Sequence, residues 1–201
     1  MIGEDIISLF ASLGDGGMLL ALIVIILIDG VGFPTIPEVW IVFIFGANPD
    51  SLLWGVALVI VASLSSLLGN FALYKLVKIA KIAKLPNWIQ RKMRQYTNFL
   101  VVKDERLLLL NRIAPVIPYT GAFIAACGWN LRRSAVYLFS GAVGKFSVIV
   151  ILSWLSFDNL REDVAPWVSV GFVAVMLAAS LIISVIYKKR MGIGGEPARS
   201  P

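Results

Sequence analysis

The sequence predicts an all-α integral membrane protein in which two opposed re-entrant helical hairpins and three transmembrane helices form an inverted repeat. Three observations support this fold class. The chain is 59% hydrophobic and only 15% charged, whereas soluble domains contain about a quarter charged residues. Its longest uncharged runs can cross a hydrocarbon core of roughly 30 Å. Two further apolar stretches are each divided into short arms by a Pro-x-x-Pro pair.

The first divided stretch predicts a re-entrant hairpin over residues 17–47. Its apolar arms, 18–28 and 39–47, would extend only about 16 Å and 13 Å as helices, so neither is expected to cross alone. Four residues that disfavour helix lie between the arms: Gly30, Gly32, Pro34 and Pro37. We therefore expect the chain to enter the membrane and return to the same side.

The second divided stretch repeats this pattern over residues 107–130, where Pro115 and Pro118 separate two short apolar arms. We expect all four prolines of the two stretches to lie at or near the hairpin tips. A hairpin followed by a full span therefore occurs twice in the chain, as in transporters built from inverted repeats.

Three uncharged or nearly uncharged runs predict transmembrane helices over residues 52–74, 134–157 and 164–187. The first has 23 uncharged residues, roughly 34 Å of helix. Residues 87–101 have apolar positions at helical spacing opposite basic ones and predict an interfacial amphipathic helix. Residues 1–190 thus form one membrane domain, and the Gly/Pro-rich tail 191–201 is expected to be disordered.

The distribution of basic residues predicts the orientation in a cell membrane. If both divided stretches are re-entrant, segment 75–106, with its nine Lys and Arg residues, shares one side with the C-terminus and with Arg132 and Arg133. Most acidic residues then lie on the other side. Because cytoplasmic loops are enriched in Lys and Arg, we expect the 75–106 loop and the C-terminus to be cytoplasmic.

Four charged residues fall within the predicted membrane segments: Asp29, Glu38, Arg112 and Lys145. Charges at this depth pair with each other or line an aqueous cavity. Structural ion pairs that hold the hairpins together are one interpretation. In the other, Arg112 and Lys145 bind an anionic headgroup, while Asp29 and Glu38 couple its movement to protons.

Two asparagines, Asn70 and Asn111, lie at similar depth. Each can form a helix-to-helix hydrogen bond or belong to a substrate site, and the sequence leaves both readings open.

Several classes of function are disfavoured. The chain has no histidine, so mechanisms that need imidazole as a base or ligand are excluded. We expect no metal, no cofactor and no enzymatic activity. The net charge of +6 is placed beside membrane spans, which favours anionic lipid rather than nucleic acid as the partner.

The run Asp29-Gly30-x-Gly32-Phe33-Pro34-x-x-Pro37-Glu38 resembles the acidic first hairpin of DedA-type membrane proteins, also called the SNARE-associated or VTT domain. Asn111-Arg112-x-x-Pro115-x-x-Pro118, followed by Gly121 and Gly128, is similar to their second hairpin. The resemblance covers residues 17–157. It implies opposed re-entrant hairpins and the flipping or scrambling of lipids, including polyprenyl phosphates, often tied to the proton-motive force.

The chain departs from this family pattern at three positions. Asn111 precedes the hairpin arginine where many bacterial members have glycine, and Pro118 stands where a second arginine would fall. Asp29 replaces the usual glutamate. Lys145 is the candidate replacement for the missing second cation.

The function we expect is therefore that of a membrane transporter for lipids, a phospholipid or polyprenyl-phosphate flippase or scramblase, in which Asp29 and Glu38 are the candidates for proton coupling. A small-ion or drug/proton exchanger and a non-catalytic membrane assembly factor are the alternatives.

Overall fold

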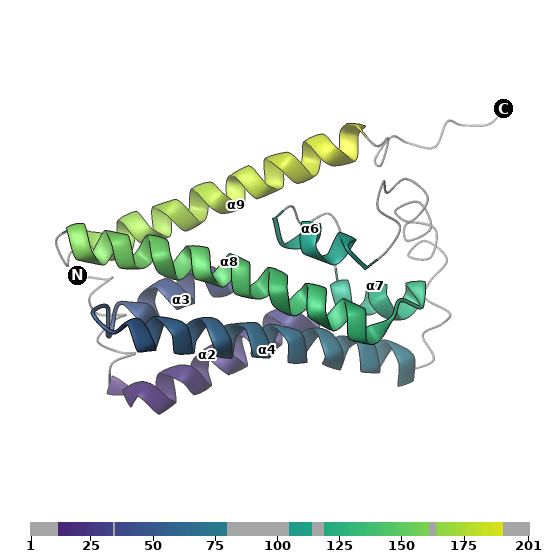
Figure 1. Ribbon diagram of the computed structural model, residues 1–201, viewed down its shortest axis with the longest axis horizontal. Helices are drawn as coiled ribbons and strands as arrows, with labels where there is room; N and C mark the ends of the chain where they lie inside the picture. The colour runs from purple at the N-terminus through teal and green to yellow at the C-terminus, as the bar shows by residue number, and fades with distance from the viewer. Residues whose placement is uncertain (1–11, 34, 80–104, 114–118, 161–163, 191–201) are drawn as a thin grey trace.

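The computed structural model describes residues 12–33, 35–79, 105–113, 119–160 and 164–190, which contain helices and short connections but no strand (Figure 1). The helices are α2 (Gly14–Val31), α3 (Pro37–Phe45), α4 (Leu52–Ile79), α6 (Leu107–Ile113), α7 (Thr120–Cys127), α8 (Leu131–Asn159) and α9 (Ala165–Arg190). By length and composition, α2, α4, α8 and α9 can each cross a membrane. These four apolar helices indicate a multi-pass membrane protein.

The three predicted spans are confirmed as long helices: α8 extends beyond its predicted bounds at both ends, whereas α4 and α9 extend only at their C-terminal ends. Helix α4 has 28 residues and α8 has 29, so each is more than 40 Å long at about 1.5 Å per residue. Helix α8 begins early because the Asn130 side chain accepts the backbone N–H groups of Arg132 and Arg133, at 3.0 and 3.2 Å. This is an N-cap, which satisfies amide groups that have no partner within the helix.

The first arm is longer than the sequence predicts, and the expectation that it is too short to cross was wrong. Helix α2 has 18 residues and is a candidate span. Asp15 lies in its first turn, where a carboxylate is favourable, and Gly30 continues the helix instead of ending it. The break comes at Gly32, which has a φ of 120°. Of the predicted tip prolines, Pro37 is the first residue of α3.

The other three tip prolines, the interfacial helix 87–101 and the tail 191–201 lie outside the described residues.

The first helix pair, α2 and α3, begins and ends at the same place. The Asn48 side chain, just after α3, donates a hydrogen bond to Asp15 Oδ1 in the first turn of α2, at 3.1 Å. The second helix pair, α6 and α7, is closed in a similar way, because the Asn130 backbone N–H donates to Glu105 Oε1 at 2.9 Å. A carboxylate therefore joins the two ends of each pair.

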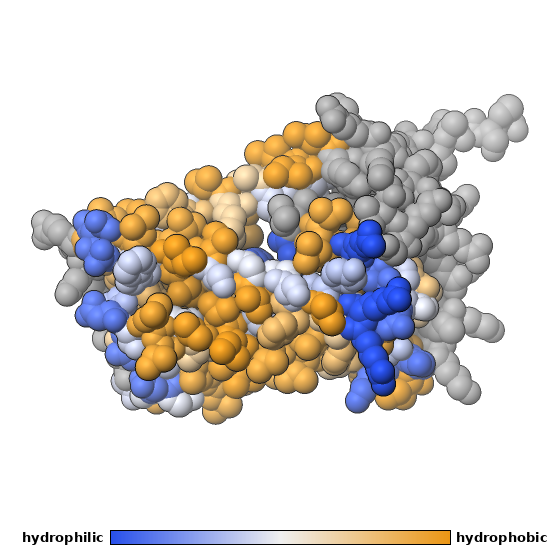
Figure 2. Space-filling model, in the orientation of Figure 1, coloured by the Kyte–Doolittle hydropathy of each residue, from blue (hydrophilic) through white to orange (hydrophobic). Residues whose placement is uncertain are grey.

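The two helix pairs start from opposite ends of the molecule. Helix α4, which follows the first pair, runs from left to right in Figure 1, and α8, which follows the second, runs back beside it. The closed end of the first pair is therefore at the left and that of the second at the right. On the face that Figure 2 shows, the described residues between these ends are mainly apolar, and most of the hydrophilic ones lie toward the two ends.

Helix α3 is the centre of the main core. All residues from Ile41 to Phe45 are buried, as expected of a helix that is apolar on every side. Helices α2, α4, α8 and α9 all contribute buried side chains to this core. A smaller core of Leu108, Ile124 and Leu138 joins α6, α7 and α8. The fold thus places both helix pairs against the same two long helices, α4 and α8.

Candidate functional site

The inner ends of the two helix pairs meet near the middle of the molecule. A Cβ atom at Gly32, which follows α2, would lie 2.8 Å from Cε1 of Tyr119, which precedes α7. The residues that precede α3 and α7, Ile36 and Tyr119, both adopt the left-handed conformation, with φ of 48° and 52°. Such values are uncommon outside glycine, and for a β-branched residue such as Ile36 they indicate local strain. The same backbone break therefore occurs in each pair.

Glycines bring both pairs onto adjacent residues of α4. A Cβ at Gly30 would be 2.8 Å from the Gly69 Cα, so α2 crosses α4 with its backbone in near contact. A Cβ at Gly121 of α7 would overlap the carbonyl oxygen of Asn70. Close helix approach through small residues is typical of membrane helix packing. The Gly69-Asn70 step is therefore the point at which both pairs dock.

The acidic residues of the first pair lie on either side of its turn. Asp29 Oδ1 accepts the backbone N–H of Thr35 at 3.4 Å, and the Thr35 hydroxyl donates to the Ile25 carbonyl at 3.1 Å, which folds the turn back on α2. Glu38, in the first turn of α3, is buried and forms an ion pair with Lys145. Lys145 is the middle residue of α8.

Arg112 reaches the same region from α6. One of its terminal nitrogens, Nη2, donates to the Ser66 hydroxyl on α4 at 3.0 Å. Its aliphatic stem lies on Gly141 of α8, where a Cβ would be 2.7 Å from Arg112 Cγ. Ser66 is near the middle of α4, so Arg112 and Lys145 both lie at mid-length of the two long helices.

The four predicted charges come together as one group, which we call the charge cluster: Asp29, Glu38, Arg112 and Lys145. Asp29 interacts electrostatically with the other three, and Arg112 interacts with both carboxylates. The two acidic and two basic side chains balance, which reduces the cost of holding charges away from water. Within the described residues the cluster can therefore act either as a structural network or as a neutral site for an anion and protons.

The two asparagines have different local contacts. Asn70 is buried and donates from its side chain to the Ser66 carbonyl, one turn back in its own helix, at 2.8 Å. Asn111 donates to the Thr120 hydroxyl at 3.2 Å, which joins α6 to α7. The asparagine beside Arg112 thus holds the arms of the second pair together.

Sequence reasoning missed Ser66 and Tyr119. Ser66 lies at mid-span in a run of small and polar residues that also includes Ser63, Ser65, Gly69 and Asn70. Such a run within a membrane helix indicates a helix contact or a polar site, and it could have been used to find Ser66. Tyr119 had no comparable signal, because its place against Gly32 depends on how two distant segments pack.

Comparison with protein-family models, with curated proteins and with solved structures finds no match for this chain. The class that the fold defines is a multi-pass helical membrane protein. Its candidate site is the charge cluster, with the Ser66 hydroxyl beside it.

Proposed function

We propose that this chain is a lipid transporter of the DedA type, in which the charge cluster binds the anionic headgroup of a lipid while the acyl tails remain in the bilayer. The α2–α3 and α6–α7 pairs act as re-entrant hairpins of an inverted repeat. In this arrangement each hairpin enters from a different face of the membrane. The geometry of the closed ends and of the inner contact at Gly32 and Tyr119 supports it.

The observation that carries the proposal concerns two cations, Arg112 and Lys145, which both lie at mid-length of the long helices. Each has a partner that an anion can replace. Among the described residues, Arg112 donates to a neutral serine hydroxyl through Nη2, and a guanidinium has five N–H donors, enough to form a fork with phosphate as well. Lys145 is paired with Glu38. A phosphate headgroup that binds Lys145 would take the place of this carboxylate.

Proton binding supplies the charge balance for that exchange. When Glu38 is protonated it no longer attracts Lys145 as an ion, and the lysine becomes available to the headgroup. Asp29, near all three other charges, is the second group that can take up a proton. Movement of a headgroup in one direction is thereby linked to protonation of the cluster.

The charge distribution at the two ends of the molecule supports a defined orientation. Arg106, Arg132 and Arg133 lie at the end where the second pair closes, whereas Asp15 and Asp50 lie where the first pair closes. By the preference of cytoplasmic loops for Lys and Arg, the end with the second pair faces the cytoplasm.

Reconstitution of the full chain into liposomes tests the proposal. An anionic lipid with a fluorescent headgroup label is placed in both leaflets, and a membrane-impermeant quencher is added outside. We expect the protected inner-leaflet fluorescence to fall with time, and an imposed pH gradient to change the rate. Protection equal to that of protein-free liposomes would refute lipid transport.

A small-ion or drug/proton exchanger is the second candidate, favoured by the balance of two carboxylates against two cations in the cluster. A pH-sensitive dye inside the same liposomes distinguishes it. Proton flux that needs a small cation or anion, but occurs without any lipid movement, would support the exchanger.

A further inference from the structure

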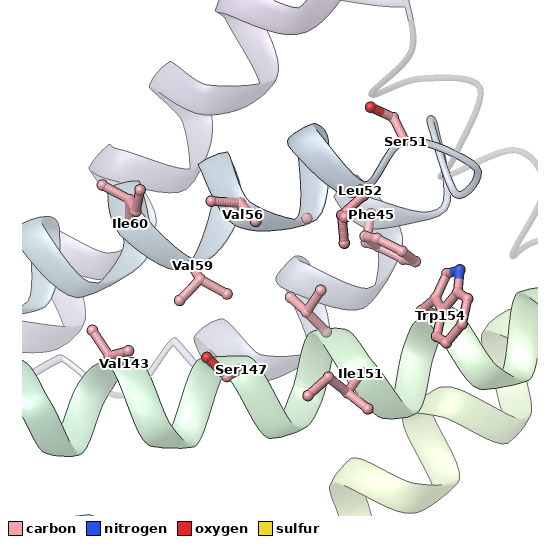
Figure 3. Close-up of a pocket in the computed structure, with 12 residues that line it drawn as sticks. Phe45, Ser51, Leu52, Val56, Val59, Ile60, Val143, Ser147, Ile151 and Trp154 are labelled. Atoms are coloured by element: carbon pink, nitrogen blue, oxygen red, sulfur yellow. The ribbon is translucent and has the colours of Figure 1, made fainter.

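An apolar groove runs along the outside of the molecule between α4 and α8 (Figure 3). Its volume is ≈ 410 Å³. Residues one turn apart line each wall, Val56 and Val59 from α4 and Ser147 and Ile151 from α8. Phe45 of α3 also contributes to the lining. The groove is therefore a concave, almost purely hydrocarbon surface on two membrane-spanning helices.

The length of this groove corresponds to about one leaflet. Along α4 it extends from Leu52, the first helical residue, to Ile60, which is about 12 Å at 1.5 Å per residue and close to half of a hydrocarbon core of roughly 30 Å. The Trp154 indole and the Ser51 hydroxyl stand at its outer end. Indole rings are enriched at the boundary between hydrocarbon and headgroups.

The same face of α4 continues inward from the groove to the charge cluster. Ser63, Ser66 and Asn70 follow Val59 at four, seven and eleven residues, which keeps them on one side of the helix. The Ser63 hydroxyl is fully buried and, within the described part of the chain, has no hydrogen-bond partner. Buried hydroxyls normally have a partner, so the Ser63 Oγ is an unsatisfied polar atom on the path from the groove to Ser66.

We propose that the α4–α8 groove binds one acyl chain of a lipid in transit, whose headgroup Arg112 holds at mid-membrane while the chain extends from Ile60 toward Trp154. The axial distance along α4 from Ile60, at the inner end of the groove, to Ser66 is about 9 Å. The part of the lipid that links the acyl chain to the phosphate would cover this distance and lie beside Ser63. The identity of the headgroup rests on the proposed function. The acyl-chain site rests on the groove itself.

The test uses a phospholipid with a photoactivatable diazirine near the end of one acyl chain, in liposomes that contain the full-length protein. After irradiation, the labelled peptides are identified by mass spectrometry. We expect adducts at 52–60 and 143–154 to exceed, several-fold, those at 175–186 of α9, whose residues are also exposed and apolar. The α9 segment is the measure of ordinary lipid contact.

A groove-filling variant, Ser147→Phe, should reduce adducts in the groove several-fold and leave labelling of α9 unchanged. Val175→Phe, on the exposed face of α9, is the matched control and should change neither. Equal labelling of the groove and α9 in the wild type would overturn the proposal, and this comparison does not depend on the variants folding. Intermolecular protein cross-links at the groove without lipid adducts would also overturn it, because a second copy would then fill the groove.

The two proposals fail in different ways. Selective groove labelling in a protein that moves no lipid would retain the acyl-chain site and reject transport. Lipid movement with no preference of the label for the groove would retain transport and reject the site.

Discussion

The ring of Tyr119 packs against Gly32, so closely that a Cβ atom at Gly32 would lie 2.8 Å from the ring. Gly32 follows α2, and Tyr119 precedes α7. These two residues belong to helix pairs that close at opposite ends of the molecule. Their contact brings the inner ends of both pairs to one level, where Asp29 and Arg112 also interact. The position of the charge cluster thus follows from how the two pairs meet.

Replacement of Gly69 by alanine should destabilise the protein, whereas the same change at Gly144 should not. A Cβ at Gly69 would lie 2.9 Å from the Gly30 Cα and 3.1 Å from the Leu27 carbonyl oxygen, backbone atoms that cannot move aside. We expect a cost of about 1–3 kcal/mol from overpacking. At Gly144 nothing lies within 4 Å of an added Cβ, so the higher helix propensity of alanine should contribute about 0.5–1 kcal/mol of stability.

Thermal unfolding of the two variants in detergent, followed by tryptophan fluorescence, checks this contrast. Equal melting temperatures for Gly69→Ala and Gly144→Ala would show that α2 and α4 are not in backbone contact.

The ion pair between Glu38 and Lys145 should be strongly coupled. Lys145→Met leaves the buried Glu38 carboxylate without its partner, which costs up to about 3–5 kcal/mol for a buried pair. Glu38→Leu combined with Lys145→Met removes both charges and should recover most of that stability. A double variant less stable than Lys145→Met would contradict the pairing.

Cysteine labelling can determine which end of the molecule faces the cytoplasm. On a Cys127→Ser background, a cysteine at the exposed Asp50 position should react with an impermeant reagent in intact cells, and one at the exposed Arg133 position should not. The physical reason is the enrichment of Lys and Arg on the cytoplasmic side. Reaction of the Arg133→Cys protein from outside would reverse the topology.

The closure of the second helix pair should weaken in acid. The backbone N–H groups of Glu105 itself and of Asn130 hold the pKa of the Glu105 carboxyl below its usual range. The ionised Glu105 carboxylate therefore contributes its full stabilisation above the pKa of the unfolded state. This stabilisation is lost as the pH falls through the lower pKa of the folded state. In an NMR titration, the chemical shift of the Asn130 amide should change as the Glu105 carboxylate takes up its proton. A shift that stays constant through this pH range, or that changes equally in Glu105→Gln, would refute the hydrogen bond.

Local patterns were sufficient to predict three of the four long helices and the break after α2. Long uncharged or nearly uncharged runs located α4, α8 and α9, and the Gly/Pro run located the turn after α2. The length of α2 was underestimated at both ends, at 14–17 and at 29–31. At the second end Gly30 was treated as a helix breaker, whereas its contact with Gly69 allows the helix to continue. A tertiary contact of this kind overrides the low helix propensity of glycine.

The composition of the candidate site was predictable, but its pairing was not. The need for intramembrane charges to find partners singled out the four members of the charge cluster. That Lys145 pairs with Glu38, and that Arg112 binds Ser66, depends on the docking of α3 and α6 against α8 and α4. Such docking leaves no local pattern in the sequence.

The most direct test of the central claim is the rate of movement of a headgroup-labelled anionic lipid in liposomes that contain purified Arg112→Lys, Asp29→Asn or Glu38→Gln protein. Lysine keeps the charge of Arg112 but cannot form its planar fork with phosphate. The loss of a charge-assisted hydrogen bond then predicts a rate at least about tenfold lower. Asp29→Asn and Glu38→Gln should abolish the dependence on a pH gradient, because an amide cannot release a proton.

Lys78→Gln, which removes an exposed charge near the end of α4, is the control and should keep the wild-type rate. Wild-type rates of lipid and proton movement in all three cluster variants would show that the charges only hold the helices together, and the proposed mechanism would then be wrong.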